Sequence, residues 1–131
     1  MTWTRVFLVV IGMVFVGIGS WALLSPAAAA KAVDIMLASP TGSVDFMALY
    51  GGFNIGYGAF LVWSAVRKAY LPAGLLSLVF ALGAAAGARG LGMMTQGMVR
   101  PLAGQWLAFE IGSAVLAALF LRYVLRQVRI G

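Results

Sequence analysis

The sequence contains no cysteine and no histidine, and only three of its 131 residues are acidic. The chain therefore lacks disulfides, thiolate nucleophiles, zinc sites built from Cys and His, and haem ligation by His. It also lacks the side chain that most often serves as a general base near neutral pH. Three carboxylates are few for an acidic metal site, so we expect neither a metal nor a cofactor.

Charge of either sign is scarce, since 9% of the residues are charged whereas 63% are hydrophobic. Soluble domains carry about 25% charged residues. A small soluble domain leaves much of its surface in water, and this chain has too few polar side chains to cover that surface. The composition predicts one integral membrane domain over residues 1–131.

The net charge of +6 does not indicate a nucleic-acid partner. The Lys and Arg residues stand at the ends of apolar runs, where the positive-inside rule expects them, and do not form one basic patch. We therefore expect membrane lipids and membrane proteins as partners and exclude nucleic acid.

Four apolar segments are each long enough to cross about 30 Å of hydrocarbon as a helix, namely 6–24, 45–66, 71–90 and 105–121. They predict an all-α, integral membrane four-helix bundle. The first segment resembles a signal peptide, but its length favours a retained span.

The connections between the spans are expected to differ in character. A short interfacial helix is predicted over 27–38, opened by Ser25 and Pro26. A turn over 39–43 follows, with Ser43 as the cap of the second span. The segment 93–104 is predicted to be a loop.

The basic residues also predict an orientation in the membrane. One side of a four-span chain carries six of them and the other carries fewer, so we expect both termini in the cytoplasm and the chain in a bacterial inner membrane. The first group comprises Arg5, Arg67, Lys68, Arg122, Arg126 and Arg129, and the second comprises Lys31 and Arg100, plus Arg89 if that residue lies outside the core.

Glycines four residues apart form two stripes, Gly52 with Gly56 and Gly83 with Gly87. Small residues at this spacing let helix backbones approach closely in lipid. We expect these glycines to pack helices within the chain, with homo-oligomerisation as the alternative.

A polar cluster is predicted in the outer half of the membrane, where charge is costly and faces a bundle interior or water. We expect an ion pair between Arg89 and Glu110, because guanidinium binds carboxylate through two parallel hydrogen bonds. Asp45 is expected as a second acceptor, with Tyr50 and Asn54 extending the network. The cluster either locks the helices together or binds a polar headgroup or a proton.

The segments Tyr50-Gly51-Gly52 and Ala88-Arg89-Gly90, followed by Glu110, resemble a family of uncharacterised bacterial four-helix membrane proteins known as domain of unknown function 4345. The chain is also distantly similar to DoxX-like proteins. The resemblance implies a four-span fold in a bacterial cytoplasmic membrane and implies no activity.

Three hypotheses about function follow, and the first is an accessory or scaffold subunit that packs within a larger membrane complex. The second is a binding protein or small carrier for a lipid-like or quinone-like molecule at the polar cluster. The third is a membrane enzyme acting on a lipophilic substrate, which ranks last because no nucleophile with an adjacent base is visible.

Overall fold

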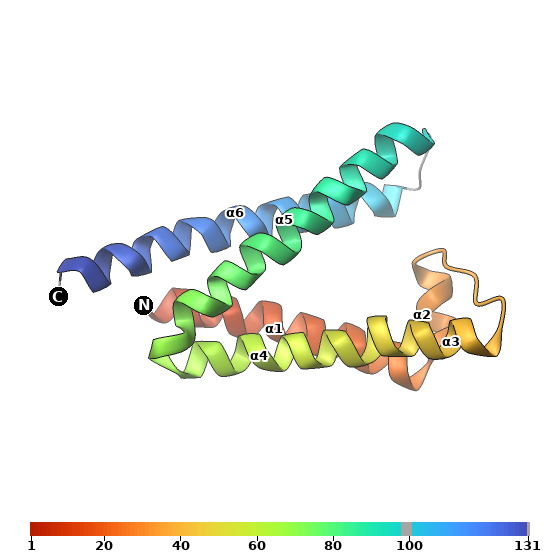
Figure 1. The fold of residues 1–131 in the computed structure, drawn as a ribbon, viewed down its shortest axis with the longest axis horizontal. Coiled ribbons are helices and arrows are strands. Elements are labelled where there is room, and N and C mark those ends of the chain that lie inside the picture. Colours follow the sequence, from red (N-terminus) through yellow and green to blue (C-terminus); the bar gives the residue numbers. More distant parts are fainter. Residues whose placement is uncertain (98–100, 131) are drawn as a thin grey trace. The chain divides into compact units, whose positions relative to one another are not determined.

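The computed structural model describes residues 1–97 and 101–130, with side chains described through residue 127, and its regular elements are all helical (Figure 1). The prediction of an all-α chain with four long apolar helices and a short helix after the first is confirmed. In chain order the elements are α1 (Thr2–Leu24), α2 (Pro26–Ala32), α3 (Pro40–Phe46), the π-helical segment η1 (Met47–Phe53), α4 (Asn54–Val66), the 3-10 turn η2 (Lys68–Tyr70), α5 (Leu71–Gln96) and α6 (Pro101–Ile130).

The chain forms two compact units, residues 2–68 and residues 69–131, which we call the first and second helix pairs. In the first pair, α3, η1 and α4 continue one another without a break and together form the second span. The η1 and α4 parts of this span lie beside α1, and α3 lies near α2 (Figure 1). In the second pair, α5 packs against α6.

Two close approaches of backbone hold the first pair together, and both depend on glycine. A Cβ atom built on Gly12 would lie 2.8 Å from the carbonyl oxygen of Gly58, and one on Gly19 would lie 2.6 Å from that of Gly51. These distances leave no room for a side chain. The absence of side chains here lets the two helices meet backbone to backbone, as small residues do in membrane helices.

The glycines predicted to pack the helices do not lie close to the backbone of the neighbouring helix within their own pair. Cβ atoms on Gly52, Gly56, Gly83 and Gly87 would have no atom within 4 Å, and all four residues are exposed. Neither stripe packs inside its own pair, and the packing of these four glycines against other helices stays a prediction. Gly51 and Gly58 face α1 instead, because they lie on a different side of the second span from Gly52 and Gly56.

The second span begins at Pro40, earlier than the predicted Asp45. Its cap is Ser39, whose Oγ accepts a hydrogen bond from the Gly42 backbone N–H at 3.0 Å. Proline follows at the first helical position, where its missing N–H is not needed. The turn predicted over 39–43 is thus the first turn of a helix, and the capping serine is not Ser43.

The short helix α2 ends at Ala32, before the predicted 38. Asp34 has a φ of 63°, a left-handed conformation that stops a helix. The Asp34 N–H donates to the Lys31 carbonyl at 3.1 Å and the Ile35 N–H donates to the Ala30 carbonyl at 2.8 Å. This pair of bonds is the Schellman motif, here with aspartate at the position that glycine usually occupies.

In the second pair, one face of α5 is buried against α6. Its buried residues recur at helical spacing, namely Leu71, Gly74, Leu75, Leu78, Leu82 and Ala86. The buried residues of α6 recur likewise, namely Glu110, Ser113, Ala117 and Val124. Such spacing gives each helix one buried stripe.

The loop predicted over 93–104 is shorter than expected at both ends. Helix α5 continues to Gln96 and is followed by Gly97, whose φ is 75°. Thr95 lies within this helix, where its hydroxyl is satisfied by donating to the Leu91 carbonyl at 3.0 Å. Helix α6 already begins at Pro101. Arg100, one of the basic residues from which the membrane orientation is predicted, lies outside the described residues.

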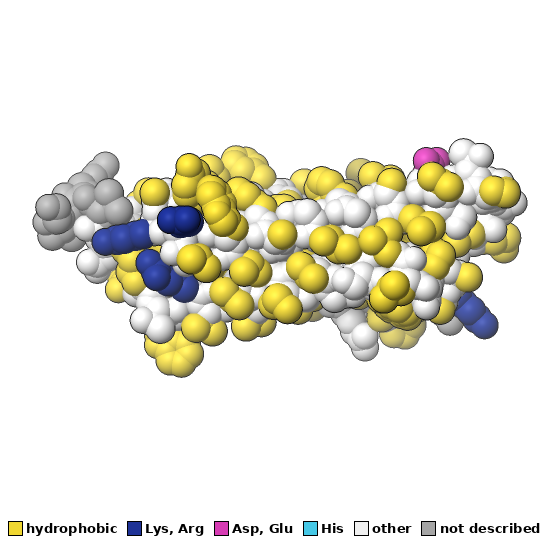
Figure 2. Space-filling model, turned by 90° about the horizontal axis from the view of Figure 1, so that it is seen from below, with side chains coloured by type: hydrophobic (Ala, Val, Ile, Leu, Met, Phe, Trp, Pro, Cys, Tyr) yellow, Lys and Arg dark blue, Asp and Glu magenta, His cyan; other side chains and the backbone are white. Residues whose placement is uncertain are grey.

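Four helical segments are long and apolar enough to cross a membrane, namely Thr2–Leu24, Pro40–Val66, Lys68–Gln96 and Pro101–Gln127. Hydrophobic side chains cover most of the face seen in Figure 2. Large apolar side chains such as Trp3, Phe80 and Met94 are more than two thirds exposed. Lipid is the environment in which such exposure is favourable.

Candidate functional site

The second helix pair contains a bidentate ion pair between its two helices. The Nε atom of Arg89 donates to Oε2 of Glu110 at 2.9 Å, and Nη2 donates to Oε1 at 2.7 Å. Both carboxylate oxygens are therefore engaged by one guanidinium, the geometry for which arginine is suited. The predicted pairing of Arg89 with Glu110 is present.

The pair lies at the end of the apolar seam between α5 and α6. Arg89 follows Leu82 and Ala86 at helical spacing, and Glu110 precedes Ser113 and Ala117 in the same way. The side chain of Glu110 is 7% exposed and that of Arg89 is 35% exposed. The carboxylate is thus buried and paired, while the side chain of Arg89 as a whole is partly exposed.

A further polar group, a buried indole N–H, lies one helical turn from the ion pair. The indole Nε1 of Trp106 is buried and has no hydrogen-bond partner among the described residues. Trp106 precedes Glu110 by four positions, and residues at this spacing are neighbours on one helix face. The Trp106 ring also meets Phe109 edge to face, with centroids 6.0 Å apart. A buried donor left unpaired costs free energy, so an acceptor here would be favourable.

Asn54 and Tyr50 belong to the first helix pair, where Asn54 serves the backbone. Its Nδ2 donates to the Tyr50 carbonyl at 2.9 Å and to the Leu49 carbonyl at 3.2 Å. Both carbonyls lie in the π-helical segment η1, whose wider turn disturbs the regular backbone hydrogen bonds. The Tyr50 ring stacks on Phe46 at a centroid distance of 4.6 Å.

Asp45 lies on α3 and is exposed. Asp45, Tyr50 and Asn54 belong to the first helix pair, whereas Arg89 and Glu110 belong to the second. The five-residue cluster with Asp45 as a second acceptor stays a prediction. Among the described residues, no group of three or more His, Cys, Asp or Glu side chains lies close enough together to hold a metal ion.

The model of one protein family matches residues 3–121. The chain belongs to that family, described as Domain of unknown function (DUF4345). No curated protein and no solved structure matches the chain. The region matched by DUF4345 includes every residue of the predicted polar cluster and ends just before Arg122.

Trp106 is the residue of this DUF4345 member that sequence reasoning did not assign to a polar role. Its spacing of four from Glu110 is the signal that would have placed its indole beside the ion pair. The close-approach glycines Gly12, Gly19 and Gly58 were missed as well. Gly12 and Gly19 are seven residues apart, as are their partners Gly51 and Gly58, and this shared heptad spacing is the signal that could have found them.

Proposed function

We propose that this chain is an accessory or scaffold subunit that packs within a larger membrane assembly. The observation that supports this most is the orientation of two glycine stripes. Gly52 with Gly56 and Gly83 with Gly87 are exposed, and an added Cβ would meet no atom within 4 Å. No atom of its own helix pair covers either stripe, so we propose that these backbones receive a helix from another protein, because small residues are what such packing uses in lipid.

The polar groups support the same proposal. Both oxygens of Glu110 are occupied by Arg89, so the carboxylate is held in a closed ion pair. Acid–base catalysis needs a group that can reach a substrate proton, and a carboxylate held in this way is poorly placed for it. We therefore propose no catalytic activity. We further propose the bacterial cytoplasmic membrane as its location, with both termini in the cytoplasm, from the distribution of Lys and Arg.

Native mass spectrometry of the chain, solubilised gently from the membranes that naturally contain it, tests this proposal. We expect a second polypeptide in fixed ratio. The double variants Gly52→Leu/Gly56→Leu and Gly83→Leu/Gly87→Leu should reduce that complex while each helix pair stays folded. Gly17→Leu is the matched control, because Gly17 is also open but lies in neither stripe. A monodisperse single chain, or equal loss in the control, would contradict the proposal.

A second candidate function is the binding of a lipid-like or quinone-like molecule beside the ion pair. The unpartnered Nε1 of Trp106 favours it, because this donor and the accessible part of Arg89 would suit a carbonyl or anionic oxygen. Arg89→Ala and Trp106→Phe should then each reduce ligand retention in extracted protein, whereas Glu110 would matter by orienting Arg89. If the variants retain the same small molecules as the parent chain, the ion pair only joins the helices.

A further inference from the structure

The C-terminal part of α6 extends beyond what a membrane span requires. A helix of 30 residues is about 45 Å long, against about 30 Å of hydrocarbon. Its apolar stretch ends at Leu121, and Arg122 is the first charged residue after Glu110. Arg122 therefore reaches the membrane surface at the point where lipid headgroups lie.

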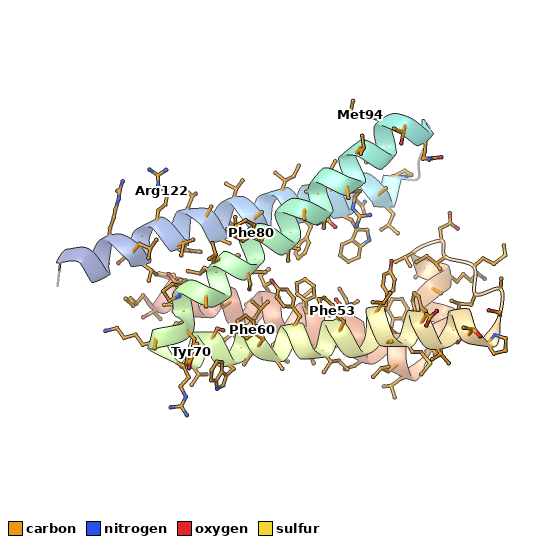
Figure 3. All side chains as sticks on the ribbon, in the orientation of Figure 1. Phe53, Phe60, Tyr70, Phe80, Met94 and Arg122 are labelled. Atoms are coloured by element: carbon orange, nitrogen blue, oxygen red, sulfur yellow. The ribbon has the colours of Figure 1, made fainter. Side chains whose placement is uncertain are left out.

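Four side chains form one exposed face here, which we call the basic face: Leu119, Arg122, Tyr123 and Arg126. Their spacing places them together on the helix, on the side opposite the buried Ala117 and Val124. Figure 3 shows Arg122 extending from α6 on the side away from α5. The four residues line a shallow hollow of about 300 Å³.

The chemistry of the basic face is that of an anion site with an apolar floor. Arg122 and Arg126 make no hydrogen bond or ion pair with any residue that the structure describes. The sequence contains no acidic residue after Glu110 that would compete for them. Leu119 and Tyr123 are 55% and 45% exposed and supply the apolar and amphipathic surface that acyl chains and glycerol contact.

Two simpler explanations account for only part of this face. Cations stabilise the end of a helix through its dipole, but this effect is confined to the last turn and Arg122 lies further back. Basic residues also fix topology, but that role requires charge alone and not an arrangement around Leu119 and Tyr123.

We propose that the basic face binds the headgroup of an anionic phospholipid. Arg122 and Arg126 would contact the phosphate, since guanidinium matches phosphate in bidentate fashion. Tyr123 would lie at the level of the glycerol and Leu119 against the acyl chains. Each arginine that contacts the headgroup in this way would contribute about a factor of five in affinity.

The test uses the purified full chain in detergent, titrated with phosphatidylglycerol or phosphatidylcholine and followed by native mass spectrometry. We expect preferential retention of phosphatidylglycerol. Arg122→Gln/Arg126→Gln should lower that preference roughly 25-fold, and each single variant about fivefold. Arg67→Gln/Lys68→Gln removes the same charge elsewhere and should leave the preference within about twofold. Because both arginines are exposed, the unfolding temperature should not change.

Three outcomes would overturn the proposal. Equal retention of the two lipids by the unmodified chain would show that there is no headgroup selectivity. An equal loss in the Arg67→Gln/Lys68→Gln control would show a dependence on net charge only. Displacement of phosphatidylglycerol by inorganic phosphate at the same concentration would show a site for free phosphate in place of a lipid.

Discussion

At the scale of single residues, Gly58 is the position where the first helix pair tolerates least change. An added Cβ would lie 2.9 Å from the Val16 backbone N and closer still to the Gly12 carbonyl oxygen. Backbone atoms cannot move aside as the end of a flexible side chain can. The helices would have to separate along much of their length.

We therefore expect Gly58→Ala to lower the free energy of unfolding by about 1–3 kcal/mol, the usual cost of overpacking. Gly56→Ala is the matched control on the same helix, because its Cβ would meet no atom within 4 Å. That control should be neutral or stabilise by up to about 1 kcal/mol through helix propensity. The two variants are compared by thermal unfolding in detergent, monitored through the helical circular dichroism signal. Equal effects of the two substitutions would show that the close approach does not govern stability.

At the scale of elements, the ion pair joins α5 to α6. We therefore expect strong energetic coupling between Arg89 and Glu110. Arg89→Leu leaves the carboxylate of Glu110, 7% exposed, without its partner, so we expect a loss of about 2 kcal/mol or more. The double variant Arg89→Leu/Glu110→Leu should lose less, since no charge stays buried. A double-mutant cycle measures the difference. Additive losses would mean that the two residues act independently.

The π-helical segment η1 depends on one side chain for part of its hydrogen bonding. Asn54→Leu removes two hydrogen bonds to the Leu49 and Tyr50 carbonyls. We expect a loss of about 1 kcal/mol, as is usual for a side-chain hydrogen bond in a membrane protein. Amide hydrogen exchange should quicken in residues 47–54 and remain unchanged in α5 and α6. Unchanged exchange in η1 would show that the wide turn forms without Asn54.

The elements also show what sequence patterns reveal and where they fail. Hydrophobic runs located all four spans, because length and apolarity are what the bilayer selects. The predicted ends of the helices are wrong where polar side chains find hydrogen bonds in the helix itself. Thr95 donates to the Leu91 carbonyl, and Ser39 makes its capping bond. Arg89 and Glu110 were paired correctly because two opposite charges in apolar helices have few other partners. The role of Asn54 was missed, because a polar residue in a span can bond its own backbone as readily as a neighbour.

At the scale of the whole molecule, the basic residues predict one orientation. Four crossings would return the chain to the side on which it starts, and would then place the N-terminus, η2 and the end of α6 on one side. Arg5, Arg67 and Lys68 lie at these positions with Arg122 and Arg126. The opposite side has Lys31 among its described residues. The positive-inside rule therefore predicts, as proposed above, that the termini lie in the cytoplasm.

The absence of cysteine makes this orientation directly measurable, because a single introduced cysteine gives the only thiol in the chain. Met36→Cys and Gln96→Cys change exposed residues of the predicted outer side, and Ala69→Cys changes an exposed residue of the inner side. A membrane-impermeant maleimide added to intact cells should label the first two and should reach the third only after lysis. The reverse pattern would invert the orientation. Labelling of Met36→Cys but not Gln96→Cys would mean that the two helix pairs do not both cross the membrane, because these positions share a side only when each pair enters and leaves as a hairpin.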